Sequence, residues 1–311
     1  MASNQVDALA FVPWSDAAGI PTTDSKTLEL ELPQVTTVFF NTQDAILKDL
    51  SVRNALQLAV DRGELAQQFP HVTPLQTPFP FFESYATSTQ LPDLEAARRL
   101  LEDQRWKLDE ATGQRFLQPA LPSRTTRATP SASSTAPTVA TSTPLALTIL
   151  VPSQGDLPLV AEHLKRRWSL LGADVTIQSA SREEIVRQAL EQRTHQVVLL
   201  TVLAQQDGDL LPFWQKTDGN LNFSQLNLPA LLTDFQSLNQ ATSSEAVVRA
   251  RTAVTERILN QRAALFLFRP SYAYFVPSSL QGTHDLQIRT PAERLSETSG
   301  WYLKTKLRWQ N

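Results

Sequence analysis

The side chains that could bind a metal ion or perform acid–base catalysis are not grouped into a recognisable motif. The sequence has no cysteine, and its four histidines share no metal-ligand spacing: His71, His163, His195 and His284. The carboxylate pairs Glu29/Glu31 and Glu183/Glu184 have no partner that would divide acid and base roles between them. No GxSxG nucleophile motif and no Gly-rich phosphate-binding motif is present. We therefore expect no enzymatic activity, no metal site and no cofactor.

A polar loop that follows one of the longest apolar segments is a better candidate for binding chemistry. Residues 197–204 form an apolar octet with the length of a buried strand, and residues 205–209 (QQDGD) follow it. Ligands of open α/β sheets bind beyond the carboxyl ends of the strands, so this loop is predicted to face a ligand. The alternative is that Asp207-Gly208-Asp209 is only a polar turn.

Three further candidate side chains come shortly after this loop: Trp214, Asn220 and Asn222. An indole can form the floor of a pocket, and an amide can bond to a peptide backbone or to a sugar hydroxyl. Packing of the loop explains the same residues equally well, and both interpretations stay open at this point.

The periodicity of the sequence predicts the elements that position these residues. Residues 26–41 predict two strands separated at Pro33, residues 49–68 a helix capped by Asp49 or Ser51, and residues 93–105 a helix capped by Asp93. Strands and helices then alternate, as strand 145–151, helix 157–171, strand 174–178, helix 182–192 and strand 196–203. Helices 228–238 and 244–261 and strands 264–269 and 272–276 follow. This alternation is typical of an α/β sheet with crossover helices.

Residues 119–144 differ in composition from the rest of the chain. They are almost wholly Pro, Ser, Thr and Ala, and have few groups that could compensate for the entropy lost on ordering. We expect a disordered linker inserted in the α/β region, the alternative being an ordered loop.

Charge and hydropathy restrict the partners. The net charge is −3 and the pI about 5.9, with the 28 Lys and Arg residues spread along the chain, so we expect no nucleic acid partner. No apolar segment approaches the roughly 20 residues that cross a bilayer. The first residues, MASNQVDALAFVPWSD, lack the pattern of a signal peptide, and without cysteine there is no lipobox cysteine on this chain.

Four segments, in order along the chain, carry a family resemblance. They are VRNALQLAVDRGEL (52–65, after Phe39-Phe40-Asn41-Thr42), LEAARRLLEDQRWKLDEATGQR (94–115), LPLVAEHLKRRWSLLGADVTI (157–177) and FWQKTDGNLNFSQLNLPALLTDF (213–235). Together they resemble the family 5 extracellular solute-binding proteins, the peptide, dipeptide and nickel receptors of ABC importers, over residues 6–302. Within the first segment, Arg53 and Asp61 are assigned structural roles.

The resemblance implies a periplasmic-binding-protein-like α/β fold, with one complete lobe and the hinge-proximal strands of a second, incomplete lobe. Residues 1–44 would be the partial first-lobe segment, residues 45–270 the ligand-binding lobe with its inserted linker, and residues 271–311 the return strands and tail packing on the first-lobe segment. Family members usually carry well over a hundred further residues ahead of the position of Val6. The resemblance therefore describes an amino-terminally shortened chain.

The resemblance also implies a binding surface. In the family, a lobe strand pairs through its backbone with the bound peptide, and an Asp after that strand neutralises the peptide ammonium. Counting back from Phe213 puts this position on Gln206, and a shift of one residue puts it on Asp207. The implied ligand-binding residues are Leu203, Ala204, Gln205, Gln206, Asp207, Asp209, Trp214, Asn220 and Asn222.

The function implied is that of a non-catalytic component of an ABC importer that binds a peptide or another small solute. Its partners would be the solute and the permease subunits, its only membrane contact would be through the transporter, and it would be periplasmic or extracytoplasmic if exported. The alternative is a truncated or decayed relative that acts as an interaction module without capturing a ligand.

Overall fold

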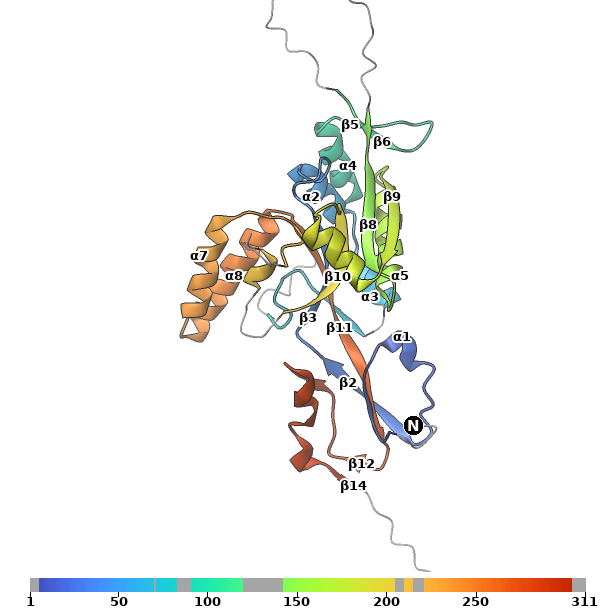
Figure 1. Cartoon of the computed structure of the whole chain (residues 1–311), viewed down its shortest axis with the longest axis vertical. Helices are drawn as coiled ribbons and strands as arrows, with labels where there is room; N and C mark the ends of the chain where they lie inside the picture. Colours follow the sequence, from blue (N-terminus) through green and yellow to red (C-terminus); the bar gives the residue numbers. More distant parts are fainter. Residues whose placement is uncertain are drawn as a thin grey trace, which may run out of the picture.

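The computed structural model describes residues 6–69, 71–82, 91–119, 142–204, 210–214 and 221–303, and shows an elongated α/β molecule (Figure 1). Within these residues a nine-stranded sheet runs along the molecule. Its order is β13 (Leu286–Gln287), β2 (Ser25–Glu31), β11 (Ala264–Pro277), β3 (Gln34–Phe40), β10 (Val197–Leu203), β8 (Ala146–Pro152) and β9 (Asp174–Ala180), while β1 (Leu9–Val12) and β4 (Val72–Pro74) also pair with β11.

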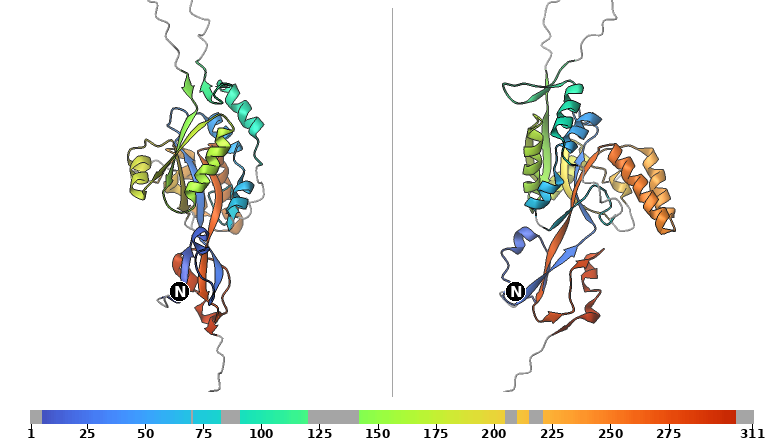
Figure 2. Two further views of the ribbon diagram at one scale, coloured as in Figure 1. Left: turned by 90° about the vertical axis from the view of Figure 1, so that its right-hand side faces the viewer. Right: turned by 180° about the vertical axis from the view of Figure 1, so that it is seen from behind.

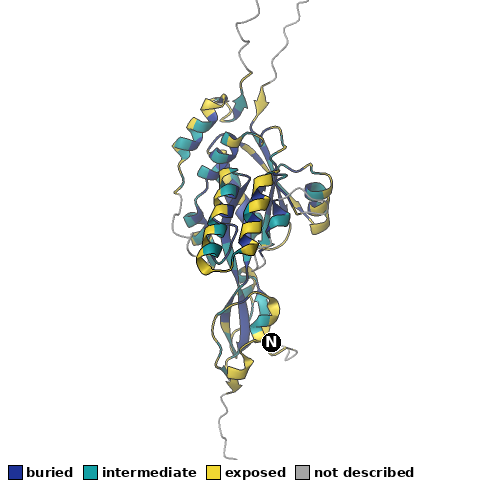
Figure 3. Cartoon of the chain, turned by 90° about the vertical axis from the view of Figure 1, so that its left-hand side faces the viewer, coloured by how far each residue is buried: buried dark blue, intermediate teal, exposed yellow. Residues whose placement is uncertain are grey.

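Helices cover both faces of the upper part of this sheet (Figure 2). One face is covered by α2 (Leu50–Leu58), α3 (Arg62–Gln68), α4 (Leu94–Asp103) and α5 (Leu157–Ser169). The other is covered by α6 (Arg182–Val186, continued by a π-helical turn Arg187–Glu191), α7 (Pro229–Gln240) and α8 (Ser244–Asn260). Each face has its own apolar cluster, and the sheet between them is buried while the helices expose their outer sides (Figure 3). The predicted α/β architecture is confirmed.

Two regions of the molecule share the strand β11. We call β3, β8–β10 and α2–α8 the lobe, and β1, α1 (Trp14–Ala17), β2, β13 and the two-stranded pair β12 (Leu280–Gln281) and β14 (Tyr302–Leu303) the ribbon unit. β3 pairs with β10 inside the lobe although it precedes residue 44, and the division into three segments stays a prediction. None of the described helices is both long and apolar enough to cross a membrane.

The strand β11 is one element where the sequence predicted two. Its first part pairs antiparallel with β3, up to Phe268 opposite Thr36, and its second part pairs with β2 from Ser271, opposite Glu31. Pro270, which has no N–H to donate, falls where the strand changes from one partner to the other. The proline therefore does not interrupt the strand, and β11 continues from the lobe into the ribbon unit.

The predicted helix over residues 49–68 is two helices. Asp49 caps α2, as expected, by accepting the N–H of Ser51 at 2.8 Å. Asp61 then caps α3, accepting the N–H groups of Gly63 and Glu64, so a second helix starts within the predicted one. The structural roles assigned to Arg53 and Asp61 are confirmed, because Arg53 donates to the carbonyls of Leu47 and Gln261 at 2.6 and 2.7 Å.

The linker prediction falls mostly outside the described residues, at positions 120–141. Its carboxyl end is corrected by the structure, because Thr143 and Pro144 form the strand β7, which pairs with β6 (Arg115–Leu117). β6 pairs in turn with β5 (Trp106–Leu108), directly after α4. The capping of α4 by Asp93 is as predicted, with the Ala96 N–H donating to its carboxylate at 2.8 Å.

Asn41 and His195 hold the segment 222–226 against the sheet. The buried Asn41 amide donates to the His195 carbonyl at 2.7 Å and accepts from Gln225 at 2.9 Å. The Nε2 atom of His195 lies 2.7 Å from the Phe223 carbonyl, which can only accept, so Nε2 carries a proton. The Asn-Thr that follows β3 therefore has a packing role, since Thr42 also bonds to the Ser224 carbonyl.

We predict that Leu56→Asp lowers the free energy of unfolding by about 3–5 kcal/mol, because it would bury an unpaired charge. Leu56 is fully buried in the cluster beneath α2. Leu50→Asp is the matched control on the same helix, since Leu50 is 48% exposed at the first turn. Urea unfolding of the two variants measures the difference, and equal midpoints would contradict the packing described.

We predict that stability falls as the pH is lowered from 7 to 5. Burial lowers the pKa of His195 and of His163 below the usual imidazole range. The folded state therefore binds fewer protons than the unfolded chain, so stability is fully present above the ordinary pKa of about 6.5 and is lost as the pH falls through the lowered one. Thermal melts at several pH values should show that His195→Gln, whose amide can still donate to the Phe223 carbonyl, loses less stability between pH 7 and pH 5 than the wild type.

His284→Gln is the control for this measurement, because His284 is exposed and pairs with Glu297 at the surface. This variant should lose as much stability as the wild type when the pH is lowered. A pH profile that is identical for His195→Gln and the wild type would rule out His195 as a source of the dependence.

Candidate functional site

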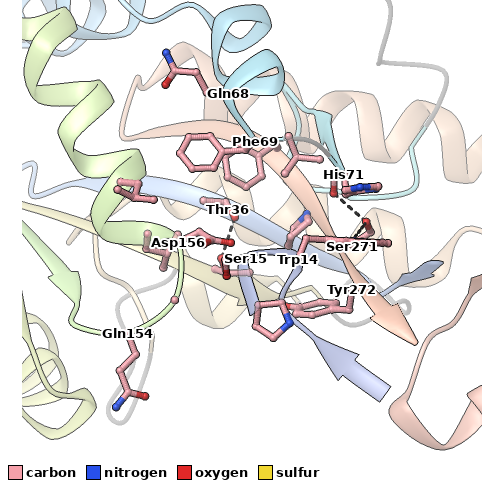
Figure 4. Close-up of a pocket in the computed structure, with 18 residues that line it drawn as sticks. Trp14, Ser15, Thr36, Gln68, Phe69, His71, Gln154, Asp156, Ser271 and Tyr272 are labelled. Carbon is pink, nitrogen blue, oxygen red and sulfur yellow. Dashed lines mark hydrogen bonds between the residues drawn. The ribbon is translucent and has the colours of Figure 1, made fainter. Parts of the chain in front are cut away.

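A cavity of about 500 Å³ lies between the ribbon unit and the lobe (Figure 4). Its walls come from residues 13–15 at α1, residues 68, 69, 71 and 72 at the end of α3 and the start of β4, residues 154–157 and 159 at the start of α5, and residues 268 and 270–272 of β11. Thr36 of β3 and Thr201 of β10 complete it. The cavity is thus at the carboxyl ends of the parallel strands β8 and β10, where open α/β sheets bind their ligands.

An aromatic stack forms the wall on the side of the ribbon unit. The Trp14 ring lies on the His71 ring, with centroids 3.6 Å apart and planes 11° from parallel. The indole N–H of Trp14 donates to the Ser271 hydroxyl at 3.2 Å. His71 has a φ of 70°, a left-handed conformation that is uncommon outside glycine. Its carbonyl accepts the Ser271 N–H at 3.1 Å, so the stack is tied to β11.

The Ser271 hydroxyl connects this wall to Glu29 of β2. It lies within hydrogen-bond distance of the Glu29 carboxylate and of the His71 carbonyl at 2.9 Å, and its single proton serves one of them at a time. The His71 Nδ1 atom is 4.0 Å from the same carboxylate. Serine, histidine and glutamate thus meet here, but among the described residues no hydrogen bond joins the Ser271 hydroxyl to the His71 ring.

The floor and the far wall are formed by paired polar groups. The hydroxyls of Thr36 and Thr201 lie 2.9 Å apart across β3 and β10. Tyr272 donates to the Gln34 amide oxygen at 2.5 Å, and burial raises the pKa of its hydroxyl. The Gln68 oxygen is 3.3 Å from Nδ1 of His163 on α5.

Asp156 is the residue immediately before α5, whose first turn opens into the cavity. It is half-buried, and its carboxylate makes no capping bond to the helix. It was not among the residues predicted from the sequence, although it follows β8 at the edge of the sheet where ligands of α/β proteins bind. Trp14 and His71 were missed as well, because no sequence pattern connects residues so far apart in the chain.

Of the residues predicted to bind ligand, Leu203 and Ala204 lie at the end of β10. Leu203 is 47% exposed and, by the alternation of a strand, points to the same side as Thr201 in the cavity wall. Ala204 is buried, and its N–H donates to the Pro33 carbonyl at 2.7 Å. The carboxyl end of β10 therefore lies at the edge of the sheet where the cavity opens.

Trp214 and Asn222 are engaged in packing. Trp214 is 2% exposed and lies against Phe39 and Phe266, with ring centroids 5.9 and 6.2 Å apart. The Asn222 amide donates to the Leu226 carbonyl at 2.7 Å and accepts the Leu226 N–H at 3.2 Å, closing a turn. For these two side chains the structure agrees with the packing alternative, and neither lines the cavity of Figure 4. The other predicted residues lie outside the described part of the chain: Gln205, Gln206, Asp207, Asp209 and Asn220.

Solved structures of low sequence identity share the fold. The oligopeptide-binding protein AppA from Bacillus subtilis, in complex with a nonapeptide, has a TM-score of 0.74 at 14% identity, covering 97% of this chain and 57% of AppA. NikZ from Campylobacter jejuni, in complex with Ni(L-His), has a TM-score of 0.75 at 14% identity, covering 96% of this chain and 58% of NikZ. DppA from Helicobacter pylori, in complex with the peptide STSA, has a TM-score of 0.71 at 14% identity, covering 98% of this chain and 54% of DppA.

The chain therefore spans a little more than half the length of these binding proteins, and their fold confirms the expected periplasmic-binding-protein-like class. No curated protein sequence matches it. The family profile described as bacterial extracellular solute-binding proteins, family 5 middle, matches residues 1–222, which is most of the 311 residues. The resemblance found in the four sequence segments is thereby confirmed, and the chain belongs to the family 5 bacterial extracellular solute-binding proteins.

Proposed function

We propose that this chain captures a short peptide, without catalysis, as the solute-binding component of an ABC importer outside the cytoplasm. The observation that carries the proposal is the cavity between the lobe and the ribbon unit, at the carboxyl ends of β8 and β10. Its volume of about 500 Å³ falls in the range of roughly 300–1,000 Å³ found for small-molecule sites. Family membership supports solute binding, and the permease subunits follow from the same proposal.

The arrangement of Ser271, His71 and Glu29 supports binding over hydrolysis. A serine nucleophile needs its hydroxyl hydrogen-bonded to the imidazole that accepts its proton. Here the hydroxyl bonds to the Glu29 carboxylate and to the His71 backbone, while the imidazole is stacked on Trp14. The three residues therefore hold the wall of the cavity together.

The peptide ammonium is proposed to bind the carboxylate of Asp207, in the loop that follows β10. Both described ends of this loop, Ala204 and Leu210, are buried in the same cluster as Trp214. The two residues that flank the segment are therefore held in the lobe, and Ala204 directly follows Leu203. Gln206 carries no charge, and Asp209 is further along the segment, so Asp207 is assigned the charge-assisted bond.

We predict that Asp207→Asn weakens the binding of short peptides by about tenfold to a hundredfold, which corresponds to the roughly 1.5–3 kcal/mol of a charge-assisted hydrogen bond. Asp209→Asn is the matched control and should change affinity less. Calorimetric titration of the two variants and the wild type with a panel of di- to tetrapeptides gives the affinities.

Two results would count against the proposal. Equal affinities for the wild type and Asp207→Asn would remove Asp207 from the site. The absence of heat with every peptide, in protein shown by its thermal melt to be folded, would favour the alternative function of an interaction module.

A further inference from the structure

The polar side chains that line the cavity mostly bond to other groups of the protein. Trp14 donates to Ser271, and Tyr272 donates to Gln34. Thr36 and Thr201 bond to each other. Gln68 accepts from His163 and from Arg166, with its oxygen 3.3 and 3.4 Å from their nitrogens. These groups shape the cavity but have little hydrogen-bonding capacity left for a ligand.

Asp156 differs from these groups, because it is the one acidic residue among the described lining residues. No hydrogen bond or ion pair with the described residues engages its carboxylate, and only its backbone carbonyl is used, by the N–H groups of Leu159 and Val160. A half-buried anion without a partner is an unfavourable arrangement that a cationic ligand would correct.

The remaining walls are apolar or aromatic. Besides Trp14 they include Phe69, Val72, Leu157 and Phe268. The described lining residues contain no lysine and no arginine, so no cation of the wall competes for Asp156. Burial of an aliphatic stem against such walls is favourable, and aromatic faces attract a cationic head.

We propose that this cavity is a specificity pocket for a cationic amine carried on an apolar stem, with Asp156 as its counter-ion. Within the proposed function, on which this assignment rests, the group is a lysine-type side chain of the bound peptide. A free aliphatic or aromatic amine has the same chemistry, and the experiment distinguishes the two sources.

The test uses calorimetric titration of the full chain with three tripeptides of equal length: Ala-Lys-Ala, Ala-norleucine-Ala and Ala-Glu-Ala. Norleucine has the four-carbon stem of lysine without its amine. Ala-Lys-Ala should bind about tenfold more tightly than Ala-norleucine-Ala, the low end for a charge-assisted contact because Asp156 is only half-buried. Ala-Glu-Ala should bind most weakly, and added salt should reduce the preference for lysine.

Asp156→Asn should remove the preference for lysine while it leaves the affinity for Ala-norleucine-Ala unchanged. Glu162→Gln is the matched control, since it removes the same charge from an exposed position of the same helix that does not line the cavity. It should preserve the preference. Asp207→Asn, by contrast, should weaken all three tripeptides alike, since each has the same amino terminus.

A second titration, with 2-phenylethylamine and 2-phenylethanol, separates the pocket from the peptide function. Binding of the amine alone, abolished by Asp156→Asn and without binding of any tripeptide, supports the pocket and contradicts the peptide function. Equal binding of the lysine and norleucine peptides overturns the pocket assignment and leaves peptide binding intact. The absence of binding by all five compounds overturns both.

Discussion

The pairing of β11 with two consecutive strands is the constraint on which the rest of the structure depends. β2 and β3 are separated only by Leu32 and Pro33, and β11 runs antiparallel to both without a break. Four residues of β11 form one wall of the cavity, at the point where the strand passes from the lobe to the ribbon unit: Phe268, Pro270, Ser271 and Tyr272. The two sides of the cavity are therefore positioned by a shared backbone, before any side chain contributes.

Side-chain contacts then fix the details of the site. Ser271, on β11, receives the indole N–H of Trp14 from α1, and its own N–H bonds to the carbonyl of His71 from the segment before β4. The stacked rings are thus held by β11, the strand that also forms one wall of the cavity. In this arrangement a serine, a histidine and a glutamate contribute to architecture, while the carboxylate of Asp156 has no hydrogen-bond partner among the described residues.

The sequence predicted the elements of the lobe well, because apolar periodicity and helix caps are local signals. The alternation of β8, α5, β9, α6 and β10 was read directly, and so was the cap at Asp93. The break between α2 and α3 was missed, since the apolar spacing continues through it and only the cap at Asp61 marks it. The continuity of β11 was missed because Pro270 is a breaker unless it falls between two pairing partners.

The candidate site was less predictable for a physical reason. Its residues come from α1, the start of β4, the start of α5 and β11, and meet only through long-range pairing that no local pattern encodes. The edge of the sheet at which ligands bind could be predicted from the order of the strands. Leu203, at the end of β10, was predicted on this basis and is exposed at that edge. For Trp214 and Asn222 the residue type alone could not distinguish binding from packing, because indole and amide groups near a loop serve either purpose.

Binding of the solute in the cavity walled by Trp14 can be tested most directly by an NMR titration with Ala-Lys-Ala that follows the indole N–H resonances. Trp14→Phe assigns the signal of Trp14. Trp168, whose indole N–H is buried and bonded to the Leu56 carbonyl at 3.0 Å, serves as the internal reference. We expect the Trp14 resonance to shift as the peptide is added, while that of Trp168 stays unchanged. A Trp14 signal that stays fixed at peptide concentrations that saturate the calorimetric binding would contradict binding in this cavity.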